Sequence, residues 1–115
     1  MLVDKQTLME NLDHDMDLLV VVYETFCEEC VTSQKSLEEA LDSADVSCIK
    51  EAAHKLKGMM ASLAAQKTQC LLEEMENIDS AESIDQAKVL YSRLKDDIRQ
   101  LHVELDDIIK STNGN

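Results

Sequence analysis

The residues most able to do chemistry lie between positions 53 and 58, where the chain reads Ala-His-Lys-Leu-Lys-Gly. The chain contains no proline and only two glycines, and one of these, Gly114, belongs to its polar tail. Gly58 is therefore the only internal glycine, and it falls inside a segment, 46–63, whose apolar spacing predicts a helix. Glycine in a helix interior costs about 1 kcal/mol relative to alanine. Because His54 lies one turn before Gly58 on the same face, we infer that the missing side chain makes this histidine accessible to a large partner.

The predicted helix turns His54 away from the core. With Ile49 at the centre of the apolar face, an advance of about 100° per residue places His54 about 140° from it. Lys57 and Gly58 follow one turn later on the same side, and Ala61 follows after a further turn. A neutral imidazole is nucleophilic near pH 7, and the Lys57 ammonium can offset the charge on a transferring phosphoryl group. These residue types at this spacing predict a histidine that accepts a phosphoryl group.

The charge of the chain limits the classes of partner. A net charge of −13 argues against nucleic acid or an anionic membrane surface as the main partner. Positive charge is concentrated around the histidine, because the segment 46–69 contains four lysines against one glutamate. That segment therefore carries +3, which leaves −16 for the rest of the chain. A basic segment in an acidic protein indicates that His54 acts on an anionic group.

Composition and apolar spacing predict an all-α fold. Aromatic residues make up 3% of the chain and turn-forming residues are scarce, which argues against a β-rich fold. Apolar residues recur at steps of three and four in five segments, at approximately 4–11, 15–41, 46–63, 66–78 and 84–109. The inward positions of the third segment are Ile49, Ala53, Leu56, Met60 and Leu63. We predict one domain over residues 1–115, an antiparallel four-helix bundle with the short first helix as a cover.

The segment 54–58, His-Lys-Leu-Lys-Gly, resembles the H-x-L-K-G signature of histidine-containing phosphotransfer (HPt) domains, the relay modules of two-component signalling. The acidic helix that contains Phe26 and the long last helix extend the resemblance over nearly the whole chain. The resemblance implies that His54 is phosphorylated at its outer nitrogen, Nε2. It also implies that Lys57 assists the phosphate and that Gly58 admits the partner.

The same resemblance implies the partners. In this family, phosphate moves between aspartates of response-regulator receiver domains by way of the histidine, and we also expect a hybrid sensor histidine kinase as a partner. Magnesium and most of the catalytic apparatus belong to the receiver, so we expect no cofactor and no metal in this chain. We predict that four further residues contribute to the partner-binding surface: Lys50, Lys55, Met59 and Ala61.

Two features depart from the family pattern. Met59 and Met60 stand where the family usually has small residues, and Ala64 replaces a glycine often found at the end of this helix. Met60 falls on the predicted inward face and should change only core packing. Met59 lies on the flank and should enlarge the apolar surface offered to a partner. None of the three is His54, Lys57 or Gly58, so they bear on partner choice more than on activity.

The remaining histidines and cysteines receive structural interpretations. His14 and His102 lack the neighbouring lysine and glycine that His54 has, and we predict surface or structural roles for both. Cys27 and Cys30 have the spacing of a redox or zinc motif, but they fall within a predicted helix and the other two cysteines form no second pair. We predict that they act as small, buried apolar residues. We find no nucleotide-binding or kinase motif, so we expect that the chain cannot phosphorylate itself from ATP.

The N-terminus lacks the features of a signal peptide, and the longest aliphatic run, 18–22, is too short to span a bilayer. We therefore expect a cytoplasmic protein with reduced cysteines. Our interpretation is a monomeric phosphorelay intermediate that accepts phosphate on His54 and passes it on. One alternative is a non-catalytic bundle that binds a receiver domain or kinase through the same surface. A second is a homodimeric coiled-coil adaptor that uses a seam from Ala87 to Ile108.

Overall fold

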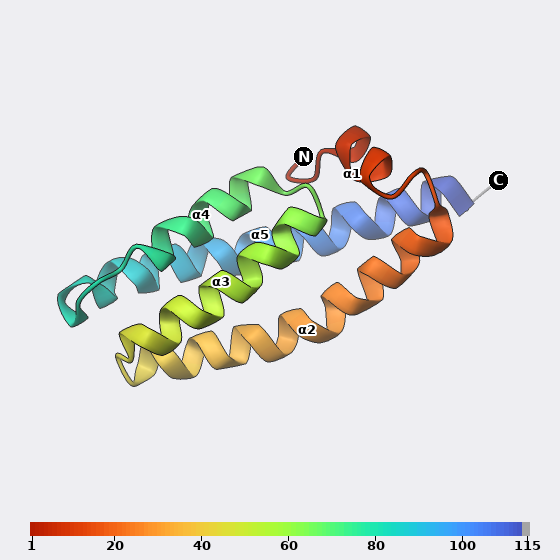
Figure 1. The fold of residues 1–115 in the computed structure, drawn as a ribbon. Helices are drawn as coiled ribbons and strands as arrows, with labels where there is room; N and C mark the ends of the chain where they lie inside the picture. The colour runs from red at the N-terminus through yellow and green to blue at the C-terminus, as the bar shows by residue number, and fades with distance from the viewer. Residues whose placement is uncertain (114–115) are drawn as a thin grey trace.

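The computed structural model describes residues 1–113, so Gly114 lies outside the described residues. The elements in chain order are α1 (Lys5–Asn11), α2 (Met16–Asp42), α3 (Val46–Ser62), α4 (Gln66–Glu76), the 3-10 turn η1 (Ala81–Ser83) and α5 (Ile84–Asn113). The main contacts between the four long helices form the ring α2–α3–α4–α5. Figure 1 shows successive helices running in opposite directions, with α1 over the end of the bundle that holds the C-terminus. The prediction of an all-α, antiparallel four-helix bundle with a short additional helix is confirmed.

Aspartate side chains fix where the first three helices begin. Each aspartate precedes its helix and accepts a hydrogen bond from the backbone N–H three residues later, in the pairs Asp4–Thr7, Asp15–Leu18 and Asp45–Cys48. Such a cap stabilises a helix by about 1 kcal/mol because it satisfies a backbone donor that the helix leaves free. The cap at Asp45 sets the start of α3 and hence which of its residues face outward.

The core is built from the inward faces that the apolar spacing predicts. The five predicted inward positions of α3 are all buried, namely Ile49, Ala53, Leu56, Met60 and Leu63. The seam of α5 is buried within the same chain at Ala87, Tyr91, Leu94, Ile98, Leu101, Leu105 and Ile108. These positions cannot also face a second chain, so the coiled-coil adaptor interpretation is wrong.

Two helix ends differ from the prediction by more than one residue. α4 ends at Glu76 rather than at 78. At this end, the N–H of Asn77 donates hydrogen bonds to carbonyl groups of the last helical turn. Ile78 is still buried, so the apolar spacing continues past the end of the helix. α5 runs to Asn113 rather than to 109. Its last turns contain a Lys110–Asp106 ion pair at 2.8 Å, a polar contact that apolar periodicity does not register.

The turn between α3 and α4 sets the register of these two helices. The N–H of Ala65 bonds to the carbonyl of Met60 at 3.0 Å, and the N–H of Ala64 bonds to that of Ala61 at 3.1 Å. This is the Schellman pattern, which requires a left-handed residue after the helix. Ala64 takes that conformation with φ of 55°, and its carbonyl accepts a hydrogen bond from the N–H of Asp4. The turn is therefore held from both α3 and the chain leading into α1.

The segment before α1 is anchored to α5. Glu104 is 3% exposed, and its carboxylate accepts hydrogen bonds from the N–H groups of Leu2 and Val3 at 3.0 and 2.9 Å. Both bonds satisfy a carboxylate that burial would otherwise disfavour. Across the described part of the chain, no helix is both long enough and apolar enough to cross a membrane.

Candidate functional site

His54 stands on the outward face of α3, opposite the buried residues that fix the rotation of the helix. Its side chain is 77% exposed, whereas Ala53 beside it is fully buried. This confirms the orientation that the apolar spacing predicts. The imidazole is therefore open to solvent and accessible to a partner.

Glu76, the last residue of α4, contacts both His54 and Lys57. Its Oε1 lies 2.9 Å from Nδ1 of His54, and its Oε2 accepts a hydrogen bond from Nζ of Lys57 at 2.8 Å. The Glu76 side chain is only 18% exposed, whereas that of His54 is 77% exposed, so the carboxylate lies lower on the surface than the imidazole. One carboxylate thus holds the side chains of both His54 and Lys57.

The contact at Nδ1 determines which ring nitrogen is free. An ionised carboxylate can only accept hydrogen bonds, so the Nδ1 that faces Glu76 carries the proton. In a neutral imidazole the other nitrogen, Nε2, then holds the lone pair. The geometry therefore directs a nucleophilic Nε2 outward, away from α4. It also places a negative charge where an imidazolium would form after Nε2 gains a substituent.

The pKa values of Glu76 and Lys57 shift in the directions expected of this arrangement. Burial by itself would raise the pKa of Glu76, but the hydrogen bonds from Lys57 and His54 outweigh burial and lower it. The hydrogen bond to Glu76 raises the pKa of Lys57. Glu76 is thus ionised and Lys57 is protonated at neutral pH, which supports the assignment of the Nδ1 proton.

Gly58 leaves open space beside the imidazole. A Cβ built on it would meet no atom within 4 Å, and its backbone is helical rather than left-handed. Neither packing nor backbone conformation therefore requires glycine at this position. The structural effect of Gly58 is to lower the surface next to His54 by one side chain.

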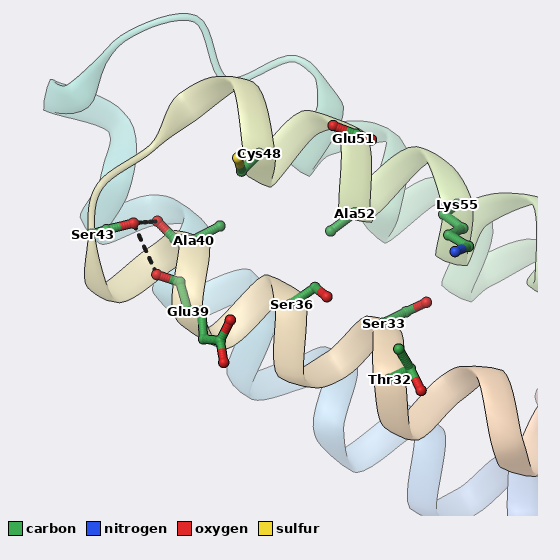
Figure 2. Close-up of a pocket in the computed structure, with 10 residues that line it drawn as sticks. All are labelled: Thr32, Ser33, Ser36, Glu39, Ala40, Ser43, Cys48, Glu51, Ala52 and Lys55. Carbon is green, nitrogen blue, oxygen red and sulfur yellow. Dashed lines mark hydrogen bonds between the residues drawn. The ribbon is translucent and has the colours of Figure 1, made fainter.

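The four residues predicted to contribute to the partner-binding surface lie on different sides of the His54–Lys57–Glu76 set. Lys50 is exposed one turn before His54. Lys55 is also exposed but lies on the other flank of α3, at a groove of about 400 Å³ between α2 and α3. Figure 2 shows Lys55 at one end of this groove, with Thr32 and Ser33 of α2 across from it. The structure does not bring Lys55 to the His54–Lys57–Glu76 set.

Met59 and Ala61 lie on opposite flanks of Gly58. Met59 is partly buried and lines an apolar hollow with residues of α2 that include Val21 and Val22. Ala61 is exposed and lines a polar hollow formed with α1 and α4. The prediction that Met60 points inward is confirmed, since that residue is fully buried. The surface around His54 thus has an apolar side toward α2 and a polar side toward α4.

The cysteines follow the prediction only in part. All four are free thiols; Cys30 is buried as predicted, but Cys27 is only half-buried, and Cys48 and Cys70 are exposed. The described residues hold no cluster of three or more side chains suited to a metal ion. His14 is exposed, and His102 is half-buried with its Nδ1 3.7 Å from Sγ of Cys27.

Glu76 is the functional residue that the sequence analysis missed. It is 22 positions from His54, so no local motif contains both. A register argument could have found it, because His54 and Glu76 are each eleven residues from Ala65 in the predicted break between the helices. Two antiparallel helices place such equidistant residues side by side.

Comparisons with known proteins agree with this geometry. Residues 21–107 match the family model described as the Hpt domain. Among solved structures, the chain resembles histidine-containing phosphotransfer protein B (HptB) from Pseudomonas aeruginosa PAO1, with a TM-score of 0.82 and 20% sequence identity over 95% of each chain. At that identity the likeness concerns the fold. No curated protein sequence matches the chain. Because the family model covers more than half of the chain, this chain belongs to the Hpt domain family of phosphorelay phosphotransfer proteins.

Proposed function

We propose that this protein is a phosphorelay intermediate that accepts a phosphoryl group on Nε2 of His54 from a receiver-domain aspartate and passes it to another receiver domain. The observation that carries the proposal is the contact of Glu76 with Nδ1 of His54 at 2.9 Å, which leaves Nε2 free on an exposed surface. Hpt domains lack the ATP site of a kinase, so the phosphoryl group must come from a partner.

In the forward step, Nε2 attacks the phosphorus in line with the aspartyl oxygen that leaves. The N–P bond forms as the P–O bond to the aspartate breaks, and the imidazole becomes cationic. The Glu76 carboxylate stabilises that cation through the Nδ1 proton, as a carboxylate does for a catalytic histidine elsewhere. The reverse step returns a neutral imidazole, so the same contact serves transfer in both directions.

Lys57 supports the transfer through charge. Its ammonium is held by Glu76 at 2.8 Å, one turn along α3 from the imidazole. Phosphoryl transfer depends mainly on positioning and on stabilising the charge of the transferring group. We assign Lys57 this stabilising role, and we expect the partner to supply magnesium.

The surface around Gly58 is the proposed docking site for the receiver. Gly58 leaves room for the partner to close over His54, Ala61 keeps the next turn low, and Met59 adds an apolar contact toward α2. Lys50 and Lys55 are proposed as peripheral cationic contacts. A hybrid sensor histidine kinase is the proposed source of phosphate, and the cytoplasm the proposed compartment. We propose that the protein acts as a monomer, because the α5 seam is used inside the bundle.

Transfer from phosphorylated receiver domains tests the proposal. The native chain, His54→Gln and the matched control His14→Gln, which replaces another exposed histidine, are mixed with several labelled receivers. We expect label on the native chain and on His14→Gln, with the acid lability and alkali stability of a phosphohistidine, and none on His54→Gln. Binding of receivers without label on any variant would contradict the proposal and favour the non-catalytic interaction bundle.

A further inference from the structure

Cys27 is the cysteine whose sulfur lies against an imidazole. Its Sγ on α2 is 3.7 Å from Nδ1 of His102 on α5. The His102 ring is held in place by two aromatic rings of α2, with centroid distances of 4.9 Å to Phe26 and 6.1 Å to Tyr23. Cys27 is half-buried rather than enclosed. A small reagent can therefore reach a thiol that has an imidazole nitrogen beside it.

Two of the other thiols are held in their unreactive form. Burial raises the pKa of Cys30 to about 11. The Sγ of Cys48 hydrogen-bonds to the Asp45 carboxylate at 3.2 Å, and this bond raises the pKa of Cys48. Because the thiolate is the nucleophile, both should react slowly. The fourth, Cys70, is exposed on α4, which makes it the natural internal reference.

We propose that Cys27 is a site of reversible oxidation by hydroperoxides, with His102 as the group that accepts the thiol proton. In the step, the Cys27 sulfur attacks one peroxide oxygen, so an S–O bond forms and the O–O bond breaks. The sulfur loses two electrons and becomes a sulfenic acid. The second peroxide oxygen takes up those electrons and the proton held by His102 and leaves as water or an alcohol. This chemistry belongs to the first step of the cysteine oxidation ladder.

The oxidised sulfur should not close a disulfide with Cys30, although the two are three residues apart. Side chains at this spacing on a helix have Cβ atoms about 5–6 Å apart, whereas a disulfide needs roughly 3.5–4.5 Å. The buried Cys30 thiol is also held in its protonated form by its raised pKa. We therefore expect the sulfenic acid to persist until a small thiol reduces it.

This site is independent of the proposed phosphotransfer. Cys27 and His102 lie between α2 and α5, whereas the His54 set lies on α3 and α4. The inference therefore does not rest on the proposed function.

Competitive oxidation within the native chain tests the proposal. The folded protein is treated with hydrogen peroxide, sulfenic acids are trapped with dimedone, and the four cysteine-containing peptides are quantified over time by mass spectrometry. We expect Cys27 to be trapped fastest, ahead of the more exposed Cys70, with Cys48 and Cys30 slowest. Faster trapping at Cys70 or Cys48 than at Cys27 would overturn the proposal.

His102→Gln separates proton acceptance from simple access. Its matched control is His14→Gln, in which an exposed histidine away from any cysteine contact is replaced. We expect His102→Gln to slow trapping at Cys27 by about tenfold, since general-base catalysis commonly supplies at least that much, with the Cys70 rate unchanged as an internal check on folding. An undiminished Cys27 rate in a variant whose Cys70 rate is unchanged would also overturn it. If both rates change, the ranking in the native chain decides.

Discussion

Gly58 and Ala64 lie six residues apart near the end of α3, and they reverse the usual placement of glycine. The backbone of Gly58 is helical, and a Cβ added there would contact nothing within 4 Å. Ala64 has φ of 55°, a conformation in which a Cβ crowds the following carbonyl oxygen and which therefore favours glycine. The helix thus has a glycine where its own structure does not need one, and an alanine where a glycine would fit better.

The contrast separates what folding requires from what a partner requires. Ala64 lies at the turn that sets the α3–α4 register, and the fold tolerates its strain because the Schellman hydrogen bonds hold it. Gly58 lies next to an exposed imidazole and costs the helix stability without any return from packing. We infer that Gly58 serves access to His54, and changes at the two positions should therefore have opposite consequences.

The largest effect should come from Glu76→Ala, which removes the carboxylate beside His54 and keeps the open surface at Gly58. If access through Gly58 were sufficient, Glu76→Ala would transfer phosphate normally. We expect it instead to slow transfer from a receiver by about 10- to 100-fold, because the imidazolium loses a charge-assisted partner. Glu76→Gln keeps a hydrogen-bond acceptor for Nδ1 and should be intermediate. Single-turnover transfer kinetics distinguish the variants, and equal rates for all three chains would remove Glu76 from the site.

Filling the space at Gly58 should separate activity from stability. Gly58→Gln should slow transfer by about tenfold by obstructing the partner, while the free energy of unfolding stays the same or rises by up to about 1 kcal/mol. The matched control is Ser47→Gln, another exposed position on α3 near its start, which should leave transfer unchanged. Urea unfolding and transfer kinetics on the same samples give both values. Loss of stability in Gly58→Gln would mean that the glycine has a packing role after all.

The converse substitution at the turn should raise stability without touching activity. Ala64→Gly relieves the left-handed alanine, and we expect the free energy of unfolding to rise by about 1 kcal/mol, or by about 4 °C in Tm. Transfer should match the native chain. Ala61→Gly, in the helical part of α3, is the matched control and should instead lower stability. A destabilised Ala64→Gly would show that the turn gains more from the alanine side chain than it loses to strain.

The smallest effect should be seen in acid. Because the pKa of Glu76 is lowered below its ordinary value of 4.5 on folding, its ionised form stabilises the fold above pH 4.5. That contribution is lost as the pH falls through the lower, folded-state pKa. The difference in unfolding free energy between the native chain and Glu76→Gln should therefore shrink below pH 4.5. A difference that stays constant down to the acid limit of the fold would contradict the assigned ionisation.

Local signals in the sequence were sufficient to locate the elements and to single out His54, Lys57 and Gly58 on α3. Apolar spacing located α3 and its inward face, and the isolated Gly58 pointed to His54. The contact with Glu76 depends on how α4 docks on α3, a long-range register that no local pattern contains. The half-buried pair of Cys27 and His102 was missed for the same reason, because it joins α2 to α5.

Helix ends were less predictable than helix faces. α4 stops before Ile78 although that residue remains in the core, because burial does not require helix. The positive φ of Ala64 could not be read from alanine, a residue that gives no turn signal. The family pattern marked this position as one where glycine is usual, and the backbone conformation now supplies the reason.

Phosphorylation at Nε2 of His54 is tested most directly by NMR of the ¹⁵N-labelled protein after transfer from a receiver domain. The arrangement of Glu76 and His54 predicts phosphorus coupled to Nε2, with Nδ1 retaining its proton. Phosphate on Nδ1, on another residue, or absent from His54 while receivers bind would contradict the proposed role of this site.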